Sequence, residues 1–311
     1  MKNLFVHIVL IAGIMAGVRG RVNAQTVQVV TKVVERTIAC PDGLTQRISI
    51  NARKADVQVR GWNRGVVGIR LRLVAKHTDR AVAEREVGYH QYTLQANGTV
   101  IELSNGFVIP QRAGKLQSQL KAVYEISIPN RALLTVNNSF GDVNLRDLAG
   151  ETTVTFEYGK LNMNELTGKL TIKSEYGDVE GQSVNTTLVC RAEKADIILR
   201  DLGGTNRIQS RYGKLYIFPD AGTMDALVVT AERTEVALLP KNLDDFSYDL
   251  TAIKTQLYQP HATTDFWTRK NDSELLNYSP PGKKPRLQIT SKYGPLHLML
   301  FTKTDVPLGS K

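Results

Sequence analysis

Apolar and polar residues alternate along most of this chain. In Val154-Thr155-Phe156-Glu157-Tyr158, every second side chain is large and apolar. Successive side chains of a β-strand point to opposite faces, so a period of two predicts strands with one buried face. Helix-forming residues are concentrated between Thr78 and Gln91, where Asp79 near the start suits the helix dipole. The pattern predicts an all-β fold with one short helix in its N-terminal half.

The strands belong to a repeat of 18 residues. Five copies of one motif follow each other without a slip: Phe140-Gly141-Asp142-Val143, Tyr158-Gly159-Lys160-Leu161, Tyr176-Gly177-Asp178-Val179, Lys194-Ala195-Asp196-Ile197 and Tyr212-Gly213-Lys214-Leu215. An apolar column recurs five residues before the second motif position: Val136, Val154, Ile172, Cys190 and Ile208. One copy cannot bury its apolar face alone, so copies must stack. The repeat predicts a single-stranded parallel β-solenoid (β-helix) with 18-residue rungs, in which equivalent residues lie about 4.8 Å apart.

Imperfect copies flank the regular block and suggest how the chain is divided. Residues 25–130 form an N-terminal β region, with one solenoid-like rung around Ala55 and a hairpin turn at Asn97-Gly98. Regular repeats occupy residues 131–239. Residues 240–285 contain several prolines and are interpreted as a loop-rich insertion with a short strand near Tyr248. Residues 286–311 hold a final rung around Gly294 and a tail.

Two of these motifs carry a family resemblance. The segment from Ile50 through Ala55 to Trp62, followed by a strand, a short helix and Val136-Asn137-Asn138-Ser139-Phe140-Gly141-Asp142-Val143, resembles the adhesin-like β-solenoid family of exported bacterial proteins. That family is related to the head domains of auto-transporter adhesins. The resemblance covers roughly residues 40 to 300 and implies a solenoid fold, export and an adhesin-like role. It implies no catalytic residues.

The first 24 residues predict export. Lys2 precedes an apolar run from Leu4 to Val18, which is shorter than the roughly 20 residues that span a bilayer. Val22-Asn23-Ala24 then places small residues before Gln25, as a signal peptidase requires. We expect residues 1–24 to be a signal peptide cleaved between Ala24 and Gln25, an uncleaved N-terminal anchor being the alternative. The mature chain is then periplasmic, secreted or on the cell surface, without a transmembrane segment.

Composition narrows the function classes. The chain has 311 residues, with 40 Lys and Arg against 30 Asp and Glu, and the positive excess is spread along the sequence. This distribution argues against a nucleic-acid partner. Two cysteines exclude a disulfide-dense scaffold and a four-cysteine zinc site. Cys190 falls in the apolar column, so we expect a buried thiol rather than a disulfide to Cys40. The histidines lack ligand spacing, and we expect no metal and no cofactor.

Two columns of the repeat carry candidate chemistry. Asp178 and Asp196 stand on neighbouring rungs, as the two carboxylates of a retaining glycosidase do. The alternative that we favour is a pair of solvated carboxylates flanked by lysines. The second column holds Phe140, Tyr158, Tyr176 and Tyr212. It is either a sugar-stacking ladder or, as its parity with the apolar column favours, a structural stack inside or at the corner of the solenoid.

Three functions remain open at this stage. We expect a non-enzymatic exported protein with adhesin-like binding of a glycan, a cell-envelope component or a protein partner. A periplasmic structural or signalling component is the first alternative. A carbohydrate-active β-helix enzyme using Asp178 and Asp196 is the second. The five residues of a possible binding face are Tyr158, Tyr176, Tyr212, Asp178 and Asp196.

Overall fold

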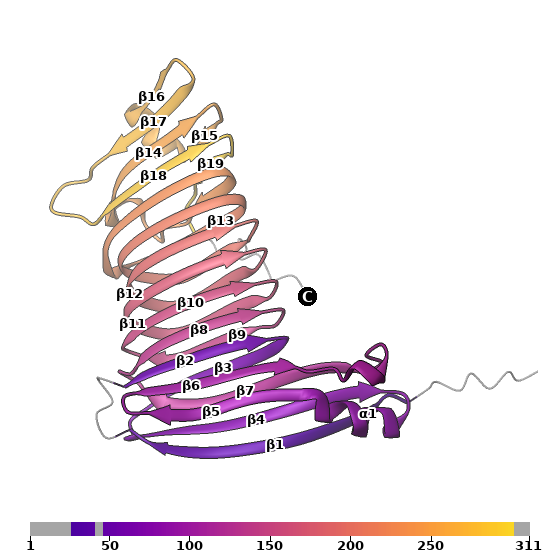
Figure 1. Ribbon diagram of the computed structural model, residues 1–311. Coiled ribbons are helices and arrows are strands. Elements are labelled where there is room, and N and C mark those ends of the chain that lie inside the picture. Colours follow the sequence, from indigo (N-terminus) through magenta and orange to yellow (C-terminus); the bar gives the residue numbers. More distant parts are fainter. Residues whose placement is uncertain (1–25, 41–45, 302–311) are drawn as a thin grey trace, which may run out of the picture.

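The structure is a computed structural model that describes residues 26–40 and 46–301. It is all-β, with one short α-helix, as the alternation of apolar residues predicted. Figure 1 shows a tall stack of strands rising from a broader N-terminal sheet, with a hairpin at the far end. The predicted signal peptide and its cleavage site, Ala24 and Gln25, lie outside the described residues.

The centre of the molecule is a parallel ladder with the predicted period. Strand β10 (Glu151–Glu157) lies between β8 (Leu133–Ser139) and the second part of β11 (Lys160–Glu175), and Val154 pairs with Val136 on one side and Ile172 on the other. The ladder continues through β12 (Asp178–Glu193) into β13 (Ile197–Leu238), while β9 (Val143–Leu148) pairs with β11. The apolar column is buried throughout, as predicted: Val136, Val154, Ile172, Cys190 and Ile208.

The N-terminal region attaches to this ladder and then changes direction. Strands β2 (Arg47–Arg53) and β3 (Ala55–Trp62), which flank the predicted turn before Ala55, pair in parallel with β8 and β9. Strand β7 (Gln119–Pro129) is parallel to β3 but antiparallel to β4 (Val66–His77), which pairs antiparallel with β1 (Gln28–Ala39). Strands β5 (His90–Asn97) and β6 (Val100–Phe107) form the hairpin predicted at Asn97-Gly98.

The predicted helix is present but shorter than its sequence window. Helix α1 spans Arg80–Glu86 and continues as the 3-10 helix η1 (Val87–Tyr89). Asp79 caps its N-terminus, because its side chain accepts a 2.8 Å hydrogen bond from the backbone N–H of Ala81. A second 3-10 helix, η2 (Gln111–Ala113), precedes β7.

The C-terminal segment is more regular than its prolines suggested. Strands β18 (Arg286–Lys292) and β19 (Leu296–Leu298) pair in parallel with β13. Strands β14 (Ser247–Ile253) and β15 (Leu257–Tyr258) then pair in parallel with β18 and β19. Strands β16 (Trp267–Lys270) and β17 (Ser273–Tyr278) form an antiparallel hairpin, with η3 (Leu243–Asp245) and η4 (His261–Phe266) nearby in the chain. The segment interpreted as loop-rich therefore holds four strands.

The predicted single-stranded parallel β-solenoid needs correction for this chain. The described strands form one mixed sheet, because β1, β4, β5, β16 and β17 all have antiparallel partners. The physical reason is that the two ends of a parallel ladder need something other than another identical coil to cover them. Antiparallel strands do this at both ends here, with no repeat to reveal them in advance.

One large apolar core runs through the stack, and smaller apolar clusters lie beside it. The large core extends from Cys40 and Ile48 near the N-terminal sheet to Leu298 near the other end. Cys190 is buried, and no disulfide joins it to Cys40. Burial raises the pKa of the Cys190 thiol to about 12. Within the described part of the chain, no helix is long and apolar enough to cross a membrane.

A buried carboxylate connects α1 to the sheet. Glu86 is 1% exposed, and its Oε2 accepts hydrogen bonds from the backbone N–H groups of Ser118 (2.6 Å) and Gln117 (3.1 Å), just before β7. Burial by itself raises the pKa of Glu86, but the bonds from Ser118 and Gln117 outweigh burial and hold it below the ordinary value of 4.5. The stability from this lowered pKa is therefore present above pH 4.5 and is lost as the pH falls further.

We expect Glu86→Gln to lower the free energy of unfolding by about 2 kcal/mol at pH 7, since charge-assisted bonds to two backbone groups are weakened. Urea unfolding followed by circular dichroism at pH 7 and at pH 3 to 4 measures this loss. The difference in free energy of unfolding between Glu86→Gln and the native chain should be smaller at pH 3 to 4 than at pH 7. An equal difference at both pH values would contradict the assignment.

Candidate functional site

The predicted aromatic column lies on an outer corner of the stack. Phe140, Tyr158 and Tyr176 are 47–48% exposed, and all three have positive φ, between 52° and 60°. Their rings are nearly parallel, with centroids 5.0 and 5.1 Å apart. Each ring therefore covers the face of the next one, and no sugar ring fits between them. This geometry matches a structural stack at the corner, and only ring edges and hydroxyls face solvent.

At the same corner, cationic side chains contact the tyrosines. The Lys194 Nζ lies 4.6 Å from the ring centroid of Tyr176 and donates to its hydroxyl at 2.9 Å. Tyr212 is only half-buried, and its hydroxyl accepts a 2.6 Å hydrogen bond from Arg233. The three tyrosines of the predicted face thus share one edge of the molecule but make different contacts.

The predicted carboxylate pair has a structural role. The Asp178 Oδ1 accepts a 2.9 Å hydrogen bond from the backbone N–H of Asp196, and the Asp196 Oδ1 accepts one of the same length from Lys214. Asp142 accepts the matching bond from the backbone N–H of Lys160 two coils earlier. The structure does bring Asp178 and Asp196 onto neighbouring coils, but each side chain is engaged with the next backbone.

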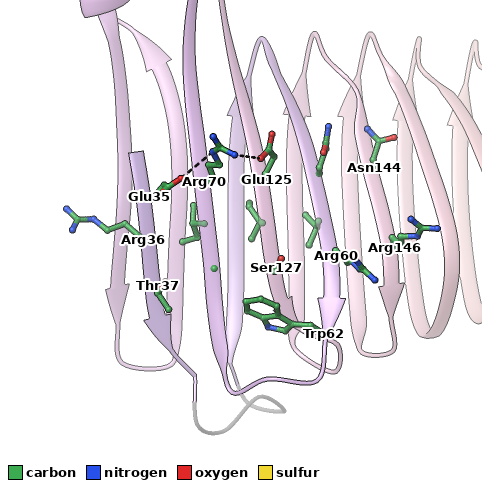
Figure 2. Close-up of a pocket in the computed structure, with 15 residues that line it drawn as sticks. Glu35, Arg36, Thr37, Arg60, Trp62, Arg70, Glu125, Ser127, Asn144 and Arg146 are labelled. Carbon is green, nitrogen blue, oxygen red and sulfur yellow. Dashed lines mark ion pairs between the residues drawn. The ribbon is translucent and has the colours of Figure 1, made fainter. Parts of the chain in front are cut away.

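A hollow on the N-terminal sheet was not foreseen from the sequence. It has a volume of about 850 Å³ and lies on the face shared by β1, β4, β7, β3 and β9. Figure 2 shows its polar side chains arranged across neighbouring strands. Residues paired across neighbouring strands form two rows here. The side chains of one row differ from those of the other in size and charge.

Ion pairs neutralise the charged side chains of the first row. It runs across the strands as Asn144, Gln58, Glu125, Arg70 and Glu35. Arg70 reaches Glu35 at 3.3 Å and Glu125 at 3.8 Å, and Arg72 from the same strand reaches Glu125 at 2.7 Å. This row forms a wall with little net charge.

The second row creates the hollow. It runs as Arg146, Arg60, Ser127, Gly68 and Thr37. Small side chains at Ser127, Gly68 and Thr37 leave the middle of the sheet uncovered, while two arginines border it on neighbouring strands (Figure 2).

The indole of Trp62 lies over Gly68 and lines the hollow. Its Nε1 donates a 2.8 Å hydrogen bond to the carbonyl of Val66, across the turn between β3 and β4. A Cβ at Gly68 would lie 3.1 Å from the indole Cη2, so the missing side chain makes room for the ring. The guanidinium of Arg64 stands 5.0 Å from the ring centroid. The ring is thereby held half-buried beside the hollow.

One sequence signal could have pointed to this site. The imperfect copy around Ala55 aligns Val57 and Val59 with Val143 and Leu145, which places Arg60 in the column of Arg146. The remaining residues come from strands that the repeat does not describe. Among residues 26–40 and 46–301, no group of three or more His, Cys, Asp or Glu could hold a metal ion.

Comparisons with known proteins give only distant likenesses. No family model matches the chain, and no curated protein matches it. Several solved structures resemble it. A protein from Bacteroides fragilis, provisionally described as an adhesin, is 13% identical, covering 87% of this chain and 97% of its own, with a TM-score of 0.31. One from Clostridium sporogenes, provisionally described as a cell adhesion protein, is 11% identical over 87% and 100%, with a TM-score of 0.27.

A third, from Parabacteroides distasonis, is provisionally described as a lipid binding protein. It is 9% identical, covering 86% of this chain and 96% of its own, with a TM-score of 0.27. TM-scores this low support neither a fold family nor a function for this chain.

Proposed function

We propose that this chain is an exported, non-enzymatic, adhesin-like protein that binds a glycan or a glycan-bearing component of the cell envelope. The observation that carries the proposal is the hollow of about 850 Å³, with an indole in its lining and hydrogen-bonding side chains across its floor. Residues 131–239 serve as its support, as a parallel β-solenoid joined to the N-terminal sheet. Export follows from the signal peptide expected in residues 1–24.

The lining suits a saccharide. Gln58 and Asn144 offer amide donors and acceptors, while Ser127 and Thr37 offer hydroxyls, the groups that pair with sugar hydroxyls. An indole presents a flat apolar face with a polar edge, which complements the C–H face of a pyranose ring. All the lining residues are on or next to strands, so the site is largely preformed and little ordering entropy is lost on binding.

A binding role fits the carboxylates better than catalysis does. Glu35 and Glu125, which line the hollow, are both ion-paired with Arg70. Asp178 and Asp196 accept backbone hydrogen bonds elsewhere in the stack. General acid–base catalysis of glycoside cleavage needs two carboxyl groups that face one bond. The proposal therefore gives these groups structural roles.

Trp62→Ala should weaken binding of an envelope saccharide about tenfold or more, since the aromatic side chain expected to contact the sugar ring is lost. Isothermal titration calorimetry with purified envelope glycan fragments measures the affinity. The chain has two tryptophans, so a Trp267→Phe background leaves Trp62 as its only indole, and ligand binding should change its fluorescence.

Trp267 lies in β16 at the opposite end of the stack, so Trp267→Ala is the matched control and should keep native affinity (Figure 1). Equal affinities for the native chain and Trp62→Ala, with no fluorescence change from Trp62, would refute the proposed site.

A further inference from the structure

We infer that the ligand in this hollow is an acidic saccharide, and that its carboxylate or phosphate group is held between Arg60 and Arg146. This inference rests on the proposed function and adds the charge of the ligand. It follows from the arrangement of cations in the second row rather than from the overall charge of the chain.

The two arginines are neighbours on adjacent strands, and the carboxylate that pairs with Arg60 is that of Asp147. Arg60 and Arg146 are direct partners in the parallel pairing of β3 with β9. Neighbouring strands lie about 4.8 Å apart, so the two side chains start side by side. Beyond them the row continues with Ser127 next to Arg60 and Asn164 next to Arg146. Neither neighbour carries a charge.

Their existing contacts leave donors available. Arg60 uses its Nε for Asp147 at 3.1 Å, and its side chain stays 70% exposed. Arg146 is exposed and, among the residues that the structure describes, makes no ion pair with any carboxylate. A guanidinium has five N–H donors in a planar fork that matches the oxygens of a carboxylate or a phosphate.

The rest of the hollow cannot supply the missing negative charge. Glu35 and Glu125 belong to the neighbouring row, where Arg70 and Arg72 already pair with them. Like charges placed directly opposite each other in a sheet are destabilising. An anion bound between Arg60 and Arg146 removes that repulsion, so the bound state gains more from an acidic ligand than from a neutral one.

The position of the indole selects a sugar acid over a bare anion. Trp62 ends β3 two residues after Arg60, and its ring lies over Gly68 in the same row as the arginines. A saccharide can place its ring against the indole and its acidic substituent between the guanidinium groups. Inorganic phosphate fills only the second of these positions and should bind weakly.

Three probes of equal length test the inference: a galacturonic acid trimer, the neutral galactose trimer, and a galactose trimer carrying one phosphate. Calorimetry on the full chain should show at least about tenfold tighter binding of one or both acidic trimers than of the neutral one. The two acidic probes distinguish a carboxylate from a phosphate. Raising NaCl from about 50 to about 300 mM should reduce this preference, because exposed charges are screened.

Arg146→Gln should abolish the preference for acidic trimers while binding of the neutral trimer persists. Its thermal midpoint should equal or exceed the native value, since the repulsion with Arg60 is removed. Arg207→Gln is the matched control, because Arg207 is an exposed strand residue outside the hollow, and this variant should keep the preference.

The outcomes separate the two proposals. Equal affinity for all three trimers, or an acidic preference that survives Arg146→Gln, overturns the acidic ligand but leaves saccharide binding intact. No binding of any trimer, with unchanged Trp62 fluorescence, overturns both.

Discussion

Removing residues 160–177 should leave a folded, soluble, β-rich protein, whereas removing residues 160–168 should not. The longer deletion takes out one full period. It brings Asp178, Val179 and Val184 into the places of Lys160, Leu161 and Leu166, their partners in the parallel register. Every residue of the later coils stays in its own column. The free energy of unfolding should therefore fall only by the contribution of one coil and its interface.

The shorter deletion takes out half a coil. It moves the residues of one column into the positions of another column that has a different environment. It moves Glu175 into the place of Leu166, then Glu193 into that of Val184 and Arg211 into that of Leu202. All three vacated positions are at most 2% exposed. Each unpaired charge buried there costs several kcal/mol, and a domain has about 5–15 kcal/mol to lose.

Circular dichroism and thermal unfolding distinguish the two deletions. The 160–177 variant should give a strand spectrum and a cooperative transition at a reduced midpoint, while the 160–168 variant should aggregate or lack a cooperative transition. Cooperative unfolding of both variants with similar midpoints would contradict this prediction. It would mean that either half of a coil can occupy the buried positions of Leu166, Val184 and Leu202.

The contrast between these deletions also explains what the sequence could predict. Within the regular block, each coil meets the same environment as its neighbours, so the same residue types recur at each position. The pairing of Val154 with Ile172 and of Ile172 with Cys190 could therefore be predicted from spacing alone. The turn at Asn97-Gly98 and the helix start near Asp79 were predictable for a different reason, since both depend on local sequence.

The ends of the stack and the hollow could not be predicted in that way. Strands β1, β4 and β7 pair over long sequence separations, and each environment occurs once. Their directions follow from tertiary packing and leave no periodic trace. The hollow depends on Ser127 lying beside Arg60 in the parallel register of β3 with β7, and on Gly68 lying beside Ser127 in the antiparallel register of β4 with β7.

The aromatic column illustrates a limit within the repeat itself. Spacing placed Tyr158 and Tyr176 on neighbouring coils, as the structure has them. Whether their ring faces were open depended on χ angles and on positive φ values, which spacing does not determine. The closed faces shift the candidate site from this column to Trp62, whose ring stacks on no other aromatic ring among residues 26–40 and 46–301.

Gly159→Ala should be among the most destabilising single substitutions in the chain, lowering the free energy of unfolding by about 3 kcal/mol or more. A Cβ at position 159 would lie 2.2 Å from the carbonyl oxygen of Gly141 and 2.8 Å from its carbon. Neither backbone shifts easily, because the Gly141 carbonyl accepts a 2.9 Å bond from Asn138 and that of Gly159 accepts a 3.1 Å bond from Asp178.

Urea unfolding of Gly159→Ala, compared with Gly222→Ala, measures this cost. The nearest atom to a Cβ at Gly222 is a side-chain oxygen of Asp220 at 3.7 Å, so the control should stay within about 0.5 kcal/mol of the native chain. Ala195 occupies the same column as Gly159 two coils further on, and the structure accommodates its Cβ there. A loss below about 1 kcal/mol for Gly159→Ala would mean that the corner at Gly141 yields in the same way, and that close backbone approach does not dictate glycine there.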